Sequence, residues 1–176
     1  MGSISTMHPW LNYQNVLDGR STYQSRPDQT YHNYALGRSS VGNLIPKWTS
    51  ALDATDKVIP GLKDKMMVFS YRTPHAIVGS ADLTFILSEN VSTQKVIEEF
   101  ERFSSSQSHD IISNDYEPLV SSDYIGSRFS CHIDHRWTEV KNGMLKLVLW
   151  YDNEYGYSSR VVDQIEKVFS MENECR

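Results

Sequence analysis

Residues 145–169 change their apolar period from two residues to three or four, and this change constrains the fold more than any other feature. Leucine occupies every second position from Leu145 to Leu149, which predicts a strand. After a polar turn, the apolar residues recur at helical spacing: Val161, Val162, Ile165, Val168 and Phe169. They predict a helix, and Ser158 or Ser159 is the expected N-cap because a hydroxyl can accept an unpaired backbone N–H. The turn is therefore expected at the carboxyl end of a sheet strand, where α/β proteins usually place ligand-contacting groups.

The rest of the chain predicts more strands than helices. Further strands are expected at residues 4–8, 65–72, 76–87, 109–113, 117–121 and 128–133. Helices are expected at residues 50–59 and after Ser92, whose hydroxyl can cap an amphipathic stretch. Asn142-Gly143 is the strongest two-residue hairpin signal in the chain. Because several connections are too short for parallel crossovers, we predict an α+β fold, a mainly antiparallel or mixed sheet with about three helices on one face.

Size and composition exclude several classes of protein. The 176 residues suit one domain with a well-buried core, and 39% hydrophobic with 22% charged residues is typical of a soluble globular domain. A net charge of -5 gives no basic surface for nucleic acid. No apolar run approaches the roughly 20 residues that cross a bilayer, so a membrane is not an expected partner either. Two cysteines, Cys131 and Cys175, do not make a disulfide framework, so the cytoplasm is the expected compartment.

Cys131-His132-Ile133-Asp134-His135 invites a metal-site interpretation, which the strand pattern disfavours. Alternate residues of a strand face opposite sides, so the possible ligands in this run are split between two faces. Tetrahedral zinc would need additional ligands at suitable spacing, and none is evident in the sequence. No metal site is therefore predicted.

The first 43 residues look like part of a longer protein that includes a functional loop. The strand predicted at residues 4–8 has no helix or cap before it, so we expect the chain to be a piece of something longer. Residues 9–43 are polar, rich in tyrosine and poor in periodicity. A stretch of that length without regular structure is usually a functional or binding loop.

Several short motifs, in order and at matching spacings, resemble the phosphorylating glyceraldehyde-3-phosphate dehydrogenase family. Asn43-Leu44-Ile45-Pro46 looks like the family's Asn-Ile-Ile-Pro, and Tyr71-Arg72-Thr73-Pro74 stands where the family has Phe-Arg-Val-Pro. Similar matches are Ala81-Asp82-Leu83-Thr84, Val120-Ser121-Ser122-Asp123-Tyr124 and the run from Trp150 to Tyr157. The resemblance extends from about Ile4 to Phe169 and covers only the family's C-terminal catalytic domain. Residues 9–43 then resemble the family's S-shaped loop, which lines cofactor and subunit contacts.

The resemblance implies an NAD-dependent reaction in which a cysteine thiolate attacks an aldehyde and phosphate releases the product. It makes His8 the catalytic base and later acid, because Thr6-Met7-His8 lies where the family has Thr-Val-His. Arg72 would clamp a substrate phosphate through its planar guanidinium, although a salt bridge at a strand end is the plain alternative. Thr49 and Ser50 stand where the family binds inorganic phosphate.

The resemblance also implies a cofactor contact and an assembly. Asn153 would hold the nicotinamide carboxamide of NAD and Tyr157 would pack near that ring, whereas without the resemblance both are ordinary turn residues. NAD itself would be bound mainly by an N-terminal domain that this sequence lacks. The implied partners are a small aldehyde, phosphate and further copies of the chain in a homo-oligomer.

Some positions depart from the family pattern. Leu11 and Tyr13 replace two small polar residues that touch the substrate's phosphate, while Gln14 is retained. Leu11 offers no side-chain donor, and a buried phosphate without donors is costly. The chain has no Ser-Cys-Thr-Thr-Asn element and no Gly-x-Gly-x-x-Gly loop after a strand, so by itself it is predicted to be inactive. The alternative hypothesis is a non-catalytic oligomerisation or binding module that keeps the fold and has lost the chemistry.

Overall fold

The computed structural model describes residues 1–19, 22–26, 29–32 and 34–174, which form two compact units, Met1–Ile77 and Val78–Arg176. Cys175 lies outside the described residues. The α-helices of the described chain are α1 (Ala51–Asp56), α2 (Thr93–Ser106) and α3 (Tyr155–Glu174). Together with mixed strand pairing in both units, they confirm the predicted α+β class.

Three strands and a hairpin form the first unit. β1 (Gly2–His8) pairs in parallel with β5 (Met66–Arg72), and β4 (Ile45–Lys47) pairs antiparallel with the other edge of β5. The connection from β4 to β5 carries α1 and a single 3-10 turn at Lys63–Lys65. In the polar stretch, β2 (Thr22–Arg26) and β3 (Gln29–His32) pair as an antiparallel hairpin, so the prediction of no regular structure was wrong there.

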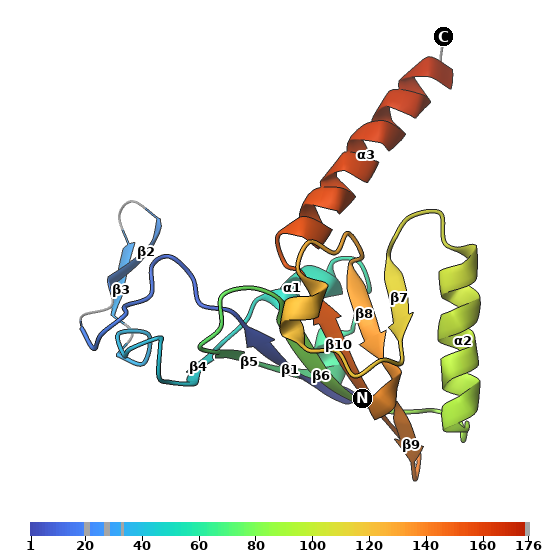
Figure 1. The fold of residues 1–176 in the computed structure, drawn as a ribbon, viewed down its shortest axis with the longest axis horizontal. Coiled ribbons are helices and arrows are strands. Elements are labelled where there is room, and N and C mark those ends of the chain that lie inside the picture. Colours follow the sequence, from blue (N-terminus) through green and yellow to red (C-terminus); the bar gives the residue numbers. More distant parts are fainter. Residues whose placement is uncertain (20–21, 27–28, 33, 175–176) are drawn as a thin grey trace. The chain divides into compact units, whose positions relative to one another are not determined.

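The second unit is built around a longer strand pair. β6 (Gly79–Ile86) and β10 (Met144–Tyr151) are antiparallel over their whole length (Figure 1). Next to β10 come β8 (Cys131–Asp134) and then β7 (Ile112–Asp115), which is parallel to β8. β9 (Glu139–Lys141) returns into β10 through the predicted hairpin turn. Single 3-10 turns lie at Ser121–Tyr124 and His135–Trp137.

Alternation along the strands builds the core of each unit. Side chains of β10 that face inward are buried, as are their neighbours on β6 and β8, and the set is Ala81, Leu83, Ile133, Leu145 and Leu147. In β5, Ser70 and Arg72 are buried while Met67 and Phe69 on the opposite face are exposed. A buried serine and a buried arginine on the inward face of a strand are unusual, so this end of β5 is a candidate functional site.

Two local predictions were wrong for related reasons. Residues 117–121 do not form a strand, because Asp123 Oδ2 accepts the backbone N–H of Val120 at 2.7 Å and a 3-10 turn follows. Neither Ser158 nor Ser159 caps the last helix, which already begins at Tyr155. The cap is Asp152, whose Oδ1 accepts the N–H groups of Glu154 and Tyr155.

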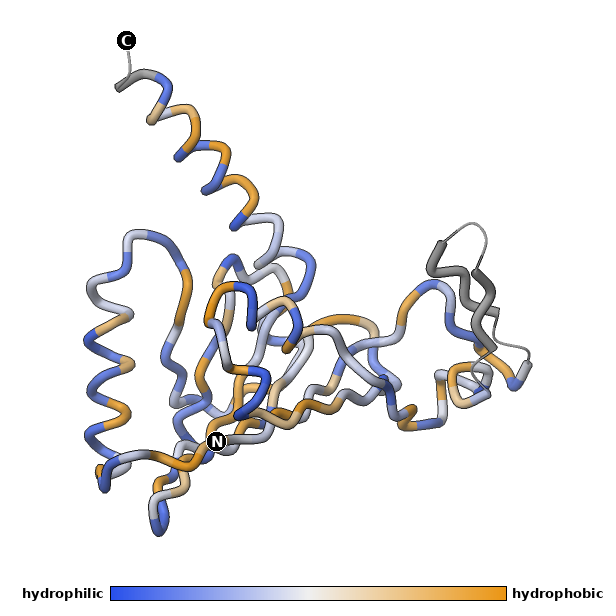
Figure 2. The backbone as a smooth tube through the Cα atoms, turned by 180° about the vertical axis from the view of Figure 1, so that it is seen from behind, coloured by the Kyte–Doolittle hydropathy of each residue, from blue (hydrophilic) through white to orange (hydrophobic). Residues whose placement is uncertain are grey.

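The last helix extends away from the strands of its unit. Figure 1 shows α3 pointing outward from the end of β10, and Figure 2 shows apolar positions recurring along it. Most of its large apolar side chains are exposed, and these include Val162, Ile165, Val168 and Phe169. Among the helices of the described chain, none combines the length and the apolar character needed to cross a lipid bilayer.

Candidate functional site

His8 and Arg72 lie side by side at the carboxyl ends of two parallel strands. They are register partners in the β1–β5 ladder, so their side chains leave the same face of the sheet. Two hydrogen bonds fix the strand ends, because both the backbone N–H and the hydroxyl of Thr73 donate to the carbonyl of His8, at 3.0 and 3.1 Å. The structure thus brings together the two residues that the sequence predicted for base and anion-clamp roles.

The surroundings of His8 keep its imidazole neutral. Nδ1 lies 2.9 Å from the carbonyl oxygen of Pro9, which can only accept, so Nδ1 carries the proton in this contact and Nε2 keeps its lone pair. Burial lowers the pKa of His8 below its ordinary value, and the positive charges of Arg72 and Lys47 lower it further. A neutral imidazole with an available Nε2 can take a proton from a nucleophile.

Arg72 is a buried cation with unused donors. Only 7% of the residue is exposed, and its Nε and Nη1 atoms are buried without a hydrogen-bond partner. In the described chain, no carboxylate forms an ion pair with Arg72, so the salt-bridge alternative has no support there. Because unpaired buried donors are costly, such a guanidinium is poised to bind an anion.

Sequence reasoning missed Lys47 and His75 near this pair, and it named Tyr13 only as a departure from the family pattern. Lys47 Nζ lies 3.4 Å from the hydroxyl oxygen of Tyr13. His75 Nδ1 lies 2.7 Å from the hydroxyl of Thr73, and both Lys47 and His75 act electrostatically on His8. Lys47 lies beside β5 because the three residues of β4 pair with that strand. No local sequence pattern predicts so short a strand.

Thr49 and Ser50 follow β4 and lead into α1. The hydroxyl of Thr49 accepts the backbone N–H of Ala51 at 3.2 Å, whereas Ser50 is the N-cap residue and its side chain makes no capping bond. Thr49 is half-buried and Ser50 is exposed. Both belong to the same unit as His8, but within the described residues neither side chain hydrogen-bonds to His8 or Arg72.

A hydrogen bond between Leu11 and Gln14 closes the turn that follows Leu11. The backbone N–H of Leu11 donates to Gln14 Oε1 at 2.9 Å, which holds the Gln14 side chain against its own turn. Gln14 Nε2 is buried and has no partner. Gln14 therefore offers a further unused donor in this unit, besides Nε and Nη1 of Arg72.

In the second unit, Asp152 positions Asn153 at the junction of β10 and α3. The Asp152 side chain is buried and binds three backbone N–H groups, those of Glu154, Tyr155 and, at 2.9 Å, Gly126. Asn153 Oδ1 is buried without a hydrogen-bond partner. An unpaired amide oxygen is the acceptor that a carboxamide N–H of nicotinamide would require.

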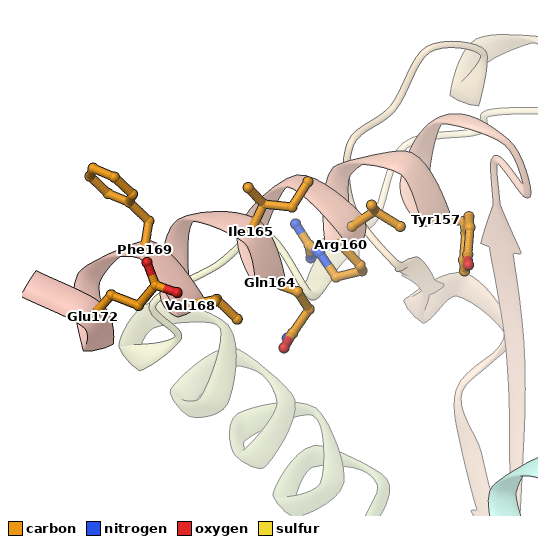
Figure 3. Close-up of a pocket in the computed structure, with 8 residues that line it drawn as sticks. Tyr157, Arg160, Gln164, Ile165, Val168, Phe169 and Glu172 are labelled. Carbon is orange, nitrogen blue, oxygen red and sulfur yellow. The ribbon is translucent and has the colours of Figure 1, made fainter.

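Tyr157 lies on the open side of α3, with 71% of the residue exposed. It lines an open, mostly apolar hollow along the helix together with Arg160, Gln164 and the apolar side chains that follow (Figure 3). Tyr157 and Asn153 come from the same short segment, and their expected places at the carboxamide and beside the ring of nicotinamide stay predictions.

Cys131 has the character of a structural thiol. Burial raises its pKa to about 11, so very little thiolate exists near neutral pH. Of the His, Cys, Asp and Glu residues in the described ranges, no group of three or more could hold a metal ion.

Comparison with known proteins gives one consistent result. Residues 1–153 match the family model for the glyceraldehyde 3-phosphate dehydrogenase C-terminal domain. Glyceraldehyde-3-phosphate dehydrogenase 1 of Kluyveromyces marxianus is 33% identical over 168 residues, and the enzyme of Schistosoma mansoni is 34% identical over 173. Glyceraldehyde-3-phosphate dehydrogenase 1 of Bacillus subtilis is 35% identical over 163 residues. These alignments cover 92–98% of this chain but only 46–48% of each relative, so the chain spans about half the length of the curated relatives it matches.

Proposed function

Because the chain belongs to the glyceraldehyde-3-phosphate dehydrogenase family and matches its C-terminal domain, we propose that it is the catalytic-domain part of an NAD-dependent, phosphorylating aldehyde dehydrogenase. One observation carries this proposal most strongly, the neutral imidazole of His8 beside the unpaired buried guanidinium of Arg72. The pair matches a reaction that needs a proton acceptor next to an anionic substrate.

His8 and Arg72 have complementary tasks in this proposal. His8 Nε2 takes the proton of a thiol supplied by the rest of the parent protein, and the imidazolium that results can later donate a proton to the developing oxyanion. Arg72 presents Nε and Nη1 to the substrate's phosphate and fixes the aldehyde relative to His8. Thr49 and Ser50 are the proposed contacts of the attacking inorganic phosphate.

Asn153 is the proposed contact of this chain with NAD. Its unpaired Oδ1 fits the nicotinamide carboxamide, and Asp152 holds the segment in place through three backbone N–H groups. NAD, held mainly by a domain outside this chain, would accept hydride from the substrate. Tyr157 is proposed to pack beside the ring. We also infer from the family a cytoplasmic homo-oligomer in which residues 9–43 line cofactor and subunit contacts.

The proposal is tested with the complete gene product, supplied with NAD, phosphate and a series of aldehydes while reduced cofactor is followed by absorbance. We expect His8→Asn to lower kcat by about 10²- to 10⁴-fold, the usual contribution of a positioned base. Arg72→Gln should instead lower kcat/KM by about tenfold to 100-fold, the range for lost hydrogen bonds to a charged group. Lys57→Gln, an exposed lysine on the same unit, is the control and should leave both values unchanged.

A second candidate is a binding or oligomerisation module without catalysis. Leu11 and Tyr13 favour it, since they remove the side chains that the family places against a substrate phosphate. A folded gene product that reduces no cofactor with any aldehyde would support this second candidate and overturn the first. So would a gene that encodes no nucleotide-binding unit beside these residues.

A further inference from the structure

We propose that Ser127, His132 and Asp115 form a second, hydrolytic site, in which Ser127 attacks the carbonyl carbon of a small neutral carboxylic ester. These three residues are named the serine triad. All of them lie in the second unit, whereas His8 and Arg72 lie in the first. The hydrolytic site is independent of the proposed dehydrogenase function, because its reaction uses neither NAD nor phosphate nor the thiol of that reaction.

Two hydrogen bonds join the serine triad in the order that nucleophilic catalysis requires. Ser127 Oγ donates to His132 Nε2 at 2.6 Å, and His132 Nδ1 donates to Asp115 Oδ2 at 2.9 Å. The directions follow from the carboxylate, which can only accept, so Nδ1 carries the proton and Nε2 keeps its lone pair toward the hydroxyl. Nucleophile, base and orienting carboxylate are therefore within hydrogen-bond reach before any substrate binds.

Strand register and aromatic packing hold the imidazole of His132 in place. Ser113 of β7 is the register partner of His132 on β8, and Asp115 lies two positions further along the same face. The ring centroids of Tyr124 and Phe129 lie 4.7 and 5.3 Å from that of His132. A ring with two aromatic neighbours and a fixed Nδ1 contact has little freedom to turn, so Nε2 keeps its direction.

The surroundings of His132 suit a base that works near neutral pH. Only 8% of the residue is exposed, and this burial lowers the pKa of His132 below its ordinary value, although the charge of Asp115 acts in the opposite direction. The imidazole is therefore neutral in the resting site and can accept a proton. Once it is protonated, the adjacent carboxylate of Asp115 stabilises the imidazolium.

The backbone around Ser127 supplies donors for negative charge on oxygen. The N–H of Phe129 donates to Ser127 Oγ at 3.3 Å, which favours that oxygen as its proton leaves. Within the described residues, the backbone N–H of Arg128 donates to no other group. In serine hydrolases the N–H of the residue after the nucleophile commonly stabilises the oxyanion. Ser127 itself is half-buried, so it is sheltered without being sealed off from solvent.

A hollow beside the serine triad indicates the class of substrate. Arg128, the residue after the nucleophile, lines a hollow of about 390 Å³ together with side chains from the first turns of α3. This volume is in the range of small-molecule sites. The Arg128 guanidinium is already paired with Asp110 at 2.8 Å, and Asp163 and Glu166 add two carboxylates to the lining. An anionic substrate is therefore disfavoured, and a neutral ester is favoured.

The proposed reaction has two steps and needs only water as co-reactant. Ser127 Oγ forms a bond to the carbonyl carbon while its proton moves to His132 Nε2. The bond from that carbon to the alcohol oxygen then breaks, and the imidazolium gives its proton to the departing oxygen. In the second step, water attacks the acyl-serine with His132 again as the base, which releases the carboxylic acid and restores the serine. No atom is oxidised or reduced.

The first experiment exposes the 176-residue chain to a fluorophosphonate probe, which reacts covalently with activated serines, and locates the modified residue by mass spectrometry. We expect the label on Ser127. Hydrolysis of p-nitrophenyl acetate, followed by the absorbance of nitrophenolate, should fall by about 10²-fold or more in Ser127→Ala. Ser122→Ala is the matched control, because Ser122 is an exposed serine of the same segment, and it should change the rate by less than about twofold.

Asp115→Asn tests the positioning role of the carboxylate. It should lower the hydrolysis rate by about 10²- to 10⁴-fold, and the ring-nitrogen NMR shifts of His132 should report a changed tautomer, which a merely structural role would leave unaltered. A folded, unaltered chain that takes no label on Ser127 would overturn the proposed site, whether or not the variants fold. Equal hydrolysis rates for Ser127→Ala and Ser122→Ala would overturn it as well. Neither outcome bears on the dehydrogenase, which is tested through His8 and cofactor reduction.

Discussion

Gly156 is the position at which one added methyl group should destabilise the second unit. It lies buried in the first turn of α3, and a Cβ atom built there would be 2.7 Å from the carbonyl oxygen of Phe129. That oxygen belongs to the backbone, so relief requires moving the segment that leads into β8. Overpacking of this kind costs about 1–3 kcal/mol, while alanine gains about 1 kcal/mol over glycine in a helix. We therefore expect Gly156→Ala to lower the free energy of unfolding by up to about 2 kcal/mol.

Urea unfolding of the 176-residue chain, followed by circular dichroism and tryptophan fluorescence, measures this change. Gly42→Ala is the matched control, because nothing lies within 4 Å of a Cβ built at Gly42. The control should be neutral or stabilising by about 0.4–1 kcal/mol through the unfolded state. A Gly156→Ala chain as stable as the Gly42→Ala chain would refute the steric reasoning and show that helix propensity decides this position.

Three further predictions use the same assay. Burial lowers the pKa of three histidines, which are His8, His132 and His135. Just below pH 6.5 the unfolded chain therefore binds more protons than the folded one. The free energy of unfolding should fall as the pH drops through that value, by at most about 1.4 kcal/mol per pH unit for each histidine. His132→Gln should make this pH dependence shallower. The Asp134 carboxylate has 0% exposure and pairs with Arg136 at 2.6 Å. Asp134→Asn removes its charge and should lower the free energy of unfolding by about 2–4 kcal/mol. A decrease below about 0.5 kcal/mol would contradict this reasoning. Ser92→Ala should cost about 1 kcal/mol, since the Ser92 hydroxyl accepts the N–H of Lys95 at 3.2 Å, whereas Ser92→Asp should be nearly neutral.

Features that depend on a few neighbouring residues could be predicted from the sequence. Asn142 and Gly143 both adopt positive φ, 50° and 75°, as a tight hairpin turn of this type requires. Ser92 caps α2 through its hydroxyl, as its place before an amphipathic stretch indicated. In each case the sequence signal and the structural cause involve the same few atoms, so no distant contact could override them.

Predictions failed where a side chain competed for backbone groups. Asp123 binds the N–H of Val120, so a 3-10 turn forms where apolar alternation predicted the end of a strand. Asp152 binds the N–H groups of Glu154 and Tyr155, so the last helix begins earlier than a serine cap predicted. An aspartate next to an apolar run is therefore ambiguous, since it can end a strand or begin a helix. Which role it takes depends on a third partner, such as the Gly126 N–H that holds Asp152 from across its unit.

The candidate site shows the same division between local and distant causes. The family pattern identified His8 and Arg72 one by one, but their adjacency follows from a parallel register between residues 64 positions apart in the chain. That register also buries Arg72 with unused donors, an arrangement that costs free energy in the empty protein. An anion that satisfies those donors recovers the cost only in the folded state, so binding should raise stability by about 1.4 kcal/mol for each tenfold of ligand above its dissociation constant. Phosphate-dependent stabilisation that Arg72→Gln removes would therefore link the packing of this strand pair directly to its proposed chemistry.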